Sequence, residues 1–323
     1  MAMTEPWSAD RIEARSRVVI DNDFCGDPDC VVEIAHHLLC RSIEIPFVVS
    51  SAVGVHHPEW TDDCVTRGVG VVREVAELAD RDDVVILEGS NMPMTDASTP
   101  AVSAAAEALV REAMRDDTDL PLYVACGGGL TTVASALLLE PRIADRMTVI
   151  WLGGEKYDMT EDELPPDVRW RETNVNTDMV ASRVVFNDFQ VPLWQMPQGV
   201  FSQALMSRSE AWSRVRSRGA LGRHVFDQIG HRVDAWSRGL KMGEAYGLGD
   251  HTLVSLTVLG GPYSPEPYTS DYTDVPRPSL LENGLYGEQA DAGTIRVYSR
   301  IDVRLLFEDF YGKLDEFAAA QEA

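Results

Sequence analysis

Arg17-Val-Val-Ile-Asp-Asn-Asp-Phe-Cys-Gly-Asp-Pro-Asp29 joins a short apolar run to four aspartates, Asp21, Asp23, Asp27 and Asp29. The apolar run predicts a buried strand, and the residues from Asp29 onward predict a helix. Carboxylates clustered at the end of a buried strand need a cation, hydrogen-bond donors or raised pKa values, because burial disfavours their charged form. We therefore expect a metal-assisted site at the end of this strand.

Outward from this stretch, apolar runs of strand length alternate with amphipathic helical stretches. This alternation predicts an α/β fold with a mostly parallel, doubly wound central sheet. Strands are expected at residues 17–21, 44–50, 84–87, 121–125, 147–152 and 191–195, and helices at 29–39, 62–78, 100–115, 130–139 and 177–187. Ligands of open α/β sheets bind beyond the carboxyl ends of strands. The acidic motif, Cys126-Gly-Gly-Gly129 and Gly153-Gly154 all fall at such ends.

The last third of the chain predicts a more helical part. Helices are expected between residues 202 and about 259, and an amphipathic helix from Asp302 to Ala319. Between them, the Pro- and Tyr-rich residues 260–284 predict a loop that covers the site as a lid. We see no internal repeat or low-complexity linker, so we expect a single domain over residues 1–323, with 1–16 as an N-terminal extension.

The composition limits the classes of partner that the protein is expected to bind. The 52 acidic residues against 28 basic ones give a formal charge of −24, which repels nucleic acids and anionic membranes and suits a neutral small molecule or a bound cation. No apolar run of about 18 residues and no signal-peptide pattern are seen, so a cytoplasmic location is expected. Five cysteines, an odd count without metal-finger spacing, predict reduced thiols.

The acidic motif has two other interpretations. Phosphatases and phosphomutases with an aspartate nucleophile and Mg²⁺ also carry Asp-x-Asp after a strand. They need in addition a Thr or Ser ending a second strand and a Lys before a later acidic pair, which we do not find here. Capping of the helix near Asp29 accounts for one or two of the four aspartates, not for all.

Later segments make a family resemblance visible. They are Cys126-Gly-Gly-Gly-Leu-Thr-Thr-Val-Ala134 with its following Glu140-Pro141, Trp151-Leu-Gly-Gly-Glu155, Glu172-Thr-Asn-Val-Asn-Thr-Asp178 and Gly247-Leu-Gly-Asp-His251. Together with the acidic motif, and in the same order, they resemble segments of the inosine-uridine nucleoside hydrolase family over residues 17 to about 260. The resemblance implies hydrolysis of the N-glycosidic bond of a ribonucleoside to ribose and free base, with Ca²⁺ as cofactor.

The chemistry of that reaction explains these residue types. The ribosyl centre becomes oxocarbenium-like, which requires an activated water and carboxylate stabilisation, and Ca²⁺ accepts several oxygen ligands. The resemblance implies that Asp23 is the general base and a calcium ligand, and that Asp250 and the Gly127 carbonyl are further ligands. Glu172 and Asn174 match residues that bind ribose hydroxyls. We expect Asp21 to support the loop as a hydrogen-bond acceptor.

The acidic motif departs from the family at its end. The usual Asp-Pro-Gly-x-Asp-Asp is lengthened here, and its last aspartate becomes Cys30 if Asp29 aligns with the first of the pair. A neutral thiol is a poor ligand for so hard an ion. Asp27, on the inserted turn, is the expected replacement. The predicted calcium ligands are therefore Asp23, Gly127, Asp250 and one or both of Asp27 and Asp29; Asp29 is also a candidate sugar contact.

Other candidate contacts follow the second strand. There Val49-Ser-Ser-Ala-Val-Gly-Val-His-His57 replaces the family's Val-Gly-Asn, so Ser50 or Ser51 is expected to stand in for the Asn. We expect His57 or His251 to donate a proton to the leaving base. An equally good interpretation of His56 and His57 is that they are ordinary loop histidines. His251 points either inward or to solvent. Aromatic side chains that could stack on a nucleobase are Trp60, Trp194, Tyr263, Tyr268 and Tyr272, with Trp194 as readily a core residue.

Two alternatives for the function stay open at this stage. The altered loops are compatible with a modified nucleoside or another glycoside as substrate. The loss of a carboxylate at Cys30 is compatible with a non-catalytic nucleoside or sugar binder on the same fold. In either case a small-molecule partner and a homodimer or homotetramer are expected.

Overall fold

The structure, a computed structural model, describes residues 8, 11–166, 171–237, 243–260 and 270–322, and of residues 232–237 the backbone alone. Within this part, nine strands form the main sheet: β1 Ser16–Asn22, β2 Ile43–Glu44, β3 Val48–Ser50, β4 Ile86–Glu88, β5 Leu122–Cys126, β6 Thr148–Leu152, β7 Leu193–Met196, β10 Asp271–Pro276 and β13 Thr294–Arg300. Their order is β10-β13-β7-β6-β5-β1-β3-β4, with β2 beside β1. All pairs are parallel except β10 with β13. The acidic motif therefore follows a central strand.

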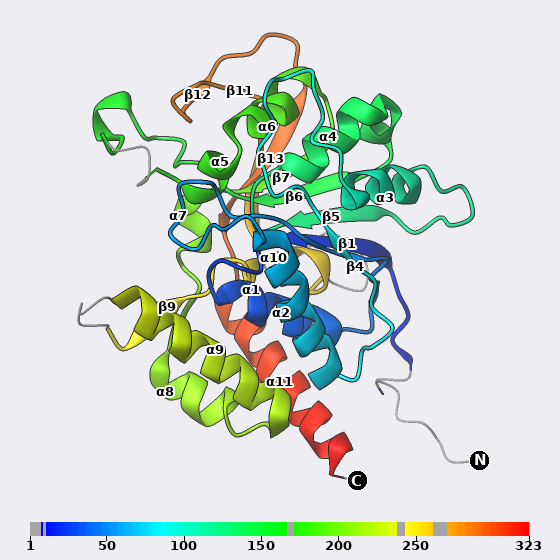
Figure 1. Cartoon of the computed structure of the whole chain (residues 1–323), viewed down its shortest axis with the longest axis vertical. Coiled ribbons are helices and arrows are strands. Elements are labelled where there is room, and N and C mark those ends of the chain that lie inside the picture. Colours follow the sequence, from blue (N-terminus) through cyan, green and yellow to red (C-terminus); the bar gives the residue numbers. More distant parts are fainter. Residues whose placement is uncertain (1–7, 9–10, 167–170, 238–242, 261–269, 323) are drawn as a thin grey trace.

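Helices cover both faces of this sheet (Figure 1). They are α1 Asp29–Leu38, α2 Cys64–Leu78, α3 Ala104–Ala113, α4 Thr131–Leu139, α5 Thr173–Thr177, α6 Met179–Arg183, α7 Gln198–Phe201, α8 Arg208–Glu210, α9 Gly219–Ser237, α10 Thr252–Thr257 and α11 Val303–Gln321. Val18 and Ile20 of β1 join the apolar core beneath α1, α2, α9, α10 and α11. Val19 joins the core beneath α3, α4 and α6. The period-two alternation along β1 therefore divides the core into two layers, and the doubly wound α/β fold is confirmed.

The expected strands and helices of the first two thirds are found, with small shifts at their ends. The strand expected at 44–50 is two short strands, β2 and β3. Pro46 lies between them, and proline has no N–H to donate to a sheet ladder. The helix expected at 177–187 is found as α6 followed by a π-helical turn over Val184–Asp188, and α5 ends just before it, because Asp178 caps α6 by accepting from Ala181 N at 2.9 Å.

The later third differs more from the sequence prediction. The expected helical part contains a small antiparallel pair, β8 Leu205–Ser207 with β9 Ala245–Gly247. Of the expected lid loop, residues 261–269 lie outside the described residues, while residues 271–276 are the edge strand β10, so that part is sheet and not loop. The sequence pattern also failed to predict β13, the strand that pairs with β10. A second small pair, β11 Ser279–Leu280 with β12 Tyr286–Gly287, follows. The C-terminal helix is confirmed as α11.

The expectation of reduced cysteines is wrong for two of the five. Cys25, in the loop after β1, forms a disulfide with Cys64, the first residue of α2. Cys30, Cys40 and Cys126 are free and buried. The pairing was missed because the two cysteines are 39 residues apart and only the fold brings them together.

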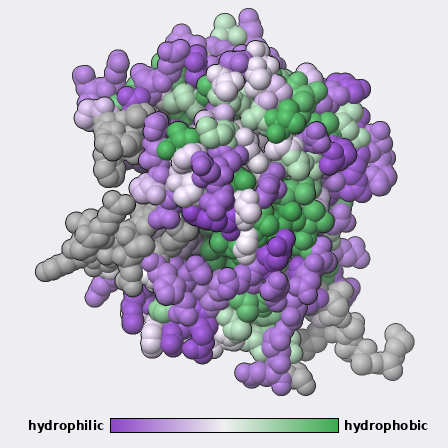
Figure 2. Space-filling model, viewed as in Figure 1, coloured by the Kyte–Doolittle hydropathy of each residue, from purple (hydrophilic) through white to green (hydrophobic). Residues whose placement is uncertain are grey.

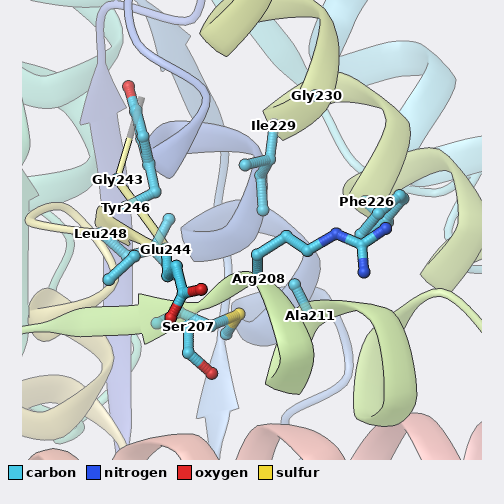
Figure 3. Close-up of a pocket in the computed structure, with 12 residues that line it drawn as sticks. Ser207, Arg208, Ala211, Phe226, Ile229, Gly230, Gly243, Glu244, Tyr246 and Leu248 are labelled. Carbon is cyan, nitrogen blue, oxygen red and sulfur yellow. The ribbon is translucent and has the colours of Figure 1, made fainter. Parts of the chain in front are cut away.

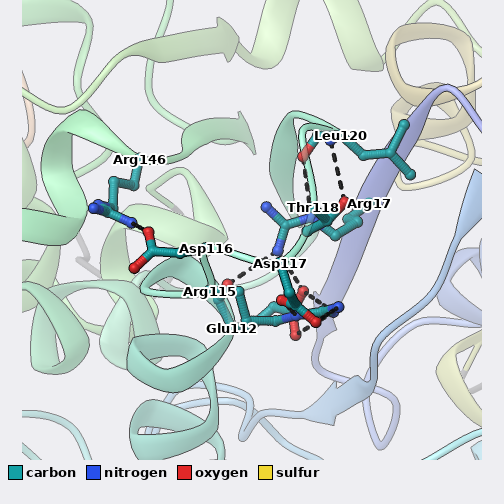
Figure 4. Close-up of polar contacts among 8 residues, drawn as sticks. All are labelled: Arg17, Glu112, Arg115, Asp116, Asp117, Thr118, Leu120 and Arg146. Atoms are coloured by element: carbon teal, nitrogen blue, oxygen red, sulfur yellow. Dashed lines mark hydrogen bonds and ion pairs between the residues drawn. The ribbon is translucent and has the colours of Figure 1, made fainter.

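A group of ion pairs ties the start of β1 to the end of α3 (Figure 4). The buried Arg17 pairs with Glu112 and donates from Nε to the Leu120 carbonyl at 3.1 Å. Arg115 reaches Glu112 at 3.1 Å and Asp117 at 2.9 Å. This anchors β1 at the end opposite to Asp23.

The surface reflects the composition. Figure 2 shows polar side chains over much of one face, with apolar side chains gathered near its middle. In the part of the chain that the structure describes, no helix is long and apolar enough to cross a membrane.

Candidate functional site

The loops after β1, β3 and β5 meet at one edge of the sheet, since these strands are parallel. Asp23 follows β1, Ser51 follows β3 and Gly127 follows β5. The backbone N–H groups of Ser51 and Gly127 donate at 2.9 Å to the carbonyls of Asn22 and Asp21 respectively. These bonds hold the three loops side by side.

Asn22 connects the carboxylates at this edge. Its Nδ2 donates to Glu33 Oε2 at 2.6 Å and to Asp250 Oδ2 at 3.0 Å, and its Oδ1 accepts from the backbone N of Asp23 at 2.8 Å. Asp250 N, in turn, donates to Asp29 Oδ2 at 3.1 Å. Residues from β1, α1 and the start of α10, far apart in the sequence, therefore form one buried carboxylate cluster, defined here as Asp23, Asp29, Glu33 and Asp250.

The carboxylates of the cluster are costly to ionise without a positive charge beside them. Burial raises the pKa of Asp23 well above its usual value, and the negative charges of Asp27 and Asp29 raise it further. Burial and the charges of Asp29 and Asp23 likewise raise the pKa of Asp250, and burial raises that of Asp29 to about 6. A bound cation would favour the ionised carboxylates and reverse these shifts.

Cys30 lies beside the cluster as a neutral thiol. Burial and the charges of Asp250, Asp29 and Asp23 raise the pKa of Cys30 well above its usual value. Its Sγ donates to the carbonyl of Asp27 at 2.9 Å. Cys30 thus helps to hold the turn that carries Asp27.

Gly127 connects the cluster to the second group of expected site residues. A Cβ at Gly127 would overlap with the side chain of Asn22, so only glycine fits this close approach. The Gly127 carbonyl accepts from Asn174 Nδ2 at 2.7 Å, and Asn174 Nδ2 also donates to the Leu152 carbonyl at 2.7 Å. The structure therefore brings Asn174 next to Gly127 and, through it, to Asn22.

Glu172 holds the turn after β6 and the start of α5. Its Oε2 accepts from Gly154 N at 2.8 Å and from Val175 N at 2.9 Å, and its Oε1 accepts from Asn174 N at 3.0 Å. Burial raises the pKa of Glu172 despite these donors. Gly154 has a φ of +95°, and a Cβ there would overlap with the Tyr286 hydroxyl, so this turn requires glycine.

Ser51 and Asp21 support the loop. Ser51 Oγ donates to Asp21 Oδ1, and burial raises the pKa of Asp21 to about 6. This geometry supports the expectation that Asp21 is a supporting acceptor, and it places the Ser51 hydroxyl on Asp21. Ser50 instead donates to the Val65 carbonyl of α2 at 2.8 Å.

The two expected proton donors lie in different surroundings. His57 is half-buried in the turn after Gly54, where its Nδ1 accepts from Glu59 N at 3.2 Å. His251 must be corrected, because it is fully buried, with Nε2 2.8 Å from His36 Nδ1 and its ring against Phe307. A ring enclosed in this way does not face a leaving base.

The aromatic residues expected to stack on a nucleobase also differ from the prediction. Trp194 must be corrected: its ring packs against Tyr123, with centroids 5.4 Å apart, and beneath the Arg296 guanidinium at 4.7 Å, so it belongs to the packing of the sheet. The Arg296 guanidinium also lies over the ring of Tyr272, on the edge strand β10, at 3.8 Å. Trp60 is half-buried, with Nε1 3.4 Å from the Asn91 carbonyl. Tyr263 and Tyr268 lie outside the described residues.

Sequence reasoning missed several site residues. Glu33 had a signal, since it lies four residues after Asp29 and therefore on the same face of α1. Asn22 had no comparable signal in the sequence, because it stands between two aspartates of the motif. Near Glu172, the stacked rings of Tyr157 and Tyr286 have centroids 4.1 Å apart, and Gln195 bonds both hydroxyls at 2.7 Å. Residues 157, 195 and 286 converge only through the fold.

An apolar cavity of about 120 Å³ lies between α9 and the β8–β9 pair (Figure 3). Ile229 lines it from α9, and Met206 and Tyr246 line it from the two strands. The apolar lining provides no ligand set for a cation. The charge of the site is therefore concentrated at the sheet edge and not in this cavity.

The residues present at the sheet edge fit a hard divalent cation. Among the described residues no group of three or more His, Cys, Asp or Glu side chains lies in an arrangement that could hold a metal ion as it stands. The donors are nevertheless carboxylate and carbonyl oxygens, which suit Ca²⁺ or Mg²⁺ and not Zn²⁺. Asp29 Oδ1 is buried and makes no hydrogen bond to any described residue, which leaves an acceptor for a ligand.

Comparison with known proteins agrees with this geometry. Residues 28–260 match the model of a family described as inosine-uridine preferring nucleoside hydrolase. Comparison with curated protein sequences gives no match.

Solved structures share the fold at low sequence identity. A purine-preferring ribonucleoside hydrolase from Gardnerella vaginalis has a TM-score of 0.73 at 16% identity, over 94% of this chain and 100% of that chain. An inosine-uridine preferring nucleoside hydrolase from Bacillus anthracis has a TM-score of 0.65 at 15% identity, over 93% and 99%. A plant nucleoside hydrolase has a TM-score of 0.70 at 14% identity, over 93% and 99%.

Proposed function

This chain belongs to the inosine-uridine preferring nucleoside hydrolase family, and from that premise we propose that it hydrolyses the N-glycosidic bond of a ribonucleoside, giving ribose and the free base. The observation that carries the proposal is the buried cluster of Asp23, Asp29 and Asp250 at the carboxyl edge of the sheet. So much buried negative charge is costly unless a ligand compensates it. The position of the cluster is where α/β sheets bind their ligands.

We propose Ca²⁺ as the compensating ligand, held by Asp23, Asp29, Asp250 and the Gly127 carbonyl, with Asp27 on the adjoining turn. When bound there, it would contact the ribose diol and lower the pKa of a bound water. Asp23 accepts the proton of the attacking water. It must be ionised for this, and its raised pKa in the absence of a cation means that base activity and cation binding are linked.

Other side chains orient the sugar and assist the leaving base. Glu172 and Asn174, fixed on the Gly127 side of the cluster, are proposed to meet the ribose hydroxyls. Ser51 acts through Asp21, which accepts its hydroxyl. His57 is the proposed proton donor to the leaving base, since His251 is enclosed among Phe307, Phe310 and His36.

The test is ribose release from inosine, uridine, adenosine, cytidine and guanosine in the presence of Ca²⁺. We expect ribose from at least one of them, and we expect Asp23→Asn to keep the fold and lose nearly all turnover. An Asp23→Asn variant with the wild-type rate removes Asp23 from the mechanism. A nucleoside that raises the melting temperature without product formation identifies a binder instead.

A modified nucleoside is the second candidate substrate, favoured by the longer acidic loop with Cys30 at its end. We also propose the homodimer or homotetramer expected from the sequence. Light scattering of the purified chain tests the assembly.

A further inference from the structure

Glu33 is a buried carboxylate with no part in the mechanism above. It lies on α1, one turn after Asp29, and its exposed fraction is 0%. Its Oε2 accepts from Asn22 Nδ2 at 2.6 Å, while its Oε1 makes no hydrogen bond to a described residue and lies 3.4 Å from His37 Nδ1. A carboxylate in such a place costs free energy that an apolar side chain of similar volume would not.

The connection from Glu33 to the proposed cation ligands runs through one amide. Asn22 uses both hydrogens of Nδ2, one toward Glu33 and one toward Asp250, and its Oδ1 accepts from Asp23 N. Rotating the amide by 180° would place Nδ2 against the Asp23 N–H, so that two donors face each other, and a single orientation of the amide is therefore compatible with its neighbours. Glu33 therefore determines where Nδ2 points, and Nδ2 determines where Asp250 Oδ2 lies.

We propose that Asn22 and Glu33 are a positioning pair that orients Asp250 and the Asp23 backbone for binding a divalent cation. The inference rests on the cation of the proposed function, and it assigns this role to two residues that do not bind the ion themselves. Hydrogen-bonded partners of metal ligands typically contribute 10- to 100-fold in metal affinity.

The experiment is calorimetric titration of the EDTA-treated, full-length protein with Ca²⁺, without nucleoside. Glu33→Ala is expected to raise the Kd for Ca²⁺ about 10- to 100-fold. Glu33→Gln keeps an oxygen that accepts from Asn22 Nδ2, so it is expected to recover most of the affinity. Glu112→Ala, which removes a buried glutamate near the opposite end of β1, is the control and is expected to leave the Kd unchanged.

A second variant keeps the test decisive if Glu33→Ala does not fold. Asn22→Ala removes the bridging amide and is expected to weaken Ca²⁺ binding by a similar factor. Because the pair acts as one unit, the double variant should lose no more affinity than Asn22→Ala alone. Thermal unfolding in EDTA shows which variants are folded.

The outcomes separate this inference from the proposed function. Folded Glu33→Ala with the wild-type Kd, or additive losses in the double variant, overturns the positioning pair. If the wild-type protein releases no ribose but the variants bind Ca²⁺ more weakly than it does, the positioning pair is supported and the hydrolase function is overturned. A wild-type protein that binds no Ca²⁺ overturns both the calcium proposal and the pair.

Discussion

Gly68 of α2 lies directly against the hydroxyl of Ser50 at the end of β3, so closely that a Cβ added to Gly68 would overlap with Ser50 Oγ. The same Cβ would stand 3.2 Å from Cβ of Phe24, which follows Asp23. Helix α2 therefore packs against both loops that begin the candidate site. Two residues further along the same helix, Gly70 has nothing within 4 Å of such a Cβ.

Gly68→Ala and Gly70→Ala are therefore expected to change stability in opposite directions. Gly68→Ala overpacks the contact with Ser50 and should lower the free energy of unfolding by about 1–3 kcal/mol. Gly70→Ala relieves the entropic cost of a helical glycine and should raise it by about 0.5–1 kcal/mol. Urea denaturation of the two variants measures both effects. If both substitutions change the free energy of unfolding in the same direction, α2 does not pack in this way.

Removal of the disulfide should destabilise the protein. The Cys25–Cys64 bond closes a loop with a sequence separation of 39 residues, and a bond of this kind typically contributes about 2–4 kcal/mol. The variant with both cysteines changed to serine is expected to lose about that much. A dithiol reductant should lower the melting temperature of the wild type and leave that of the double variant unchanged. A wild type insensitive to reductant would argue against the bond.

Ca²⁺ binding should release protons and strengthen with pH. Burial raises the pKa of Asp29 to about 6 and those of Asp23 and Asp250 well above their usual values, so at pH 6 and below these groups hold protons in the cation-free protein. A ligand cation must displace them, so affinity rises as pH rises through 6 and falls below it. Titration in buffers of different ionisation enthalpy counts the protons released at pH 6, where Asp29 is about half protonated.

The matched control for this measurement is the exposed Asp116, which pairs with Arg146 at the surface. Asp116→Asn should release as many protons as the wild type, and Asp29→Asn fewer. Absence of proton release at pH 6 would mean that the carboxylates are already ionised without the ion, or that the ion binds elsewhere.

The two adjacent histidines after β3 allow a test of the leaving-group acid. His57→Ala should lower kcat about 10²- to 10⁴-fold if His57 protonates the base. His56→Ala, at the exposed neighbouring position, should keep the wild-type kcat. If His57→Ala is as active as His56→Ala on a nucleoside with a poor leaving group, His57 is a loop residue and the base is protonated by another group.

The sequence was most informative where local pattern and chemistry coincide. The strand 17–21 and the helix from Asp29 were found almost as predicted, because a buried parallel strand and an amphipathic helix have distinct periodicities. Prediction was poorer after residue 200, where the strands of the β8–β9 pair have three residues each. Strands so short carry too few residues for an alternation to be seen.

In the candidate site, too, the sequence predicted some residues well and others poorly. Asp23, Asp29, Gly127 and Asp250 were named from motif and resemblance, and the fold places them around Asn22. His251, expected as a proton donor, is enclosed, and Trp194 takes the core position that was the open alternative, because residue type alone does not show whether a ring faces a cavity or the core. Their surroundings, His36, Phe307 and Tyr123 among them, come from distant parts of the chain.

The amino-acid sequence alone determined the α/β architecture, and it predicted the edge of the sheet for the candidate site and oxygen ligands for a cation, because periodicity and residue type are local properties. Only the tertiary structure decided the Cys25–Cys64 bond, the enclosure of His251 and the link from Glu33 through Asn22 to Asp250. Each of these depends on a distance between side chains that are separated in the chain by other elements, and such distances are set by the packing of the whole core.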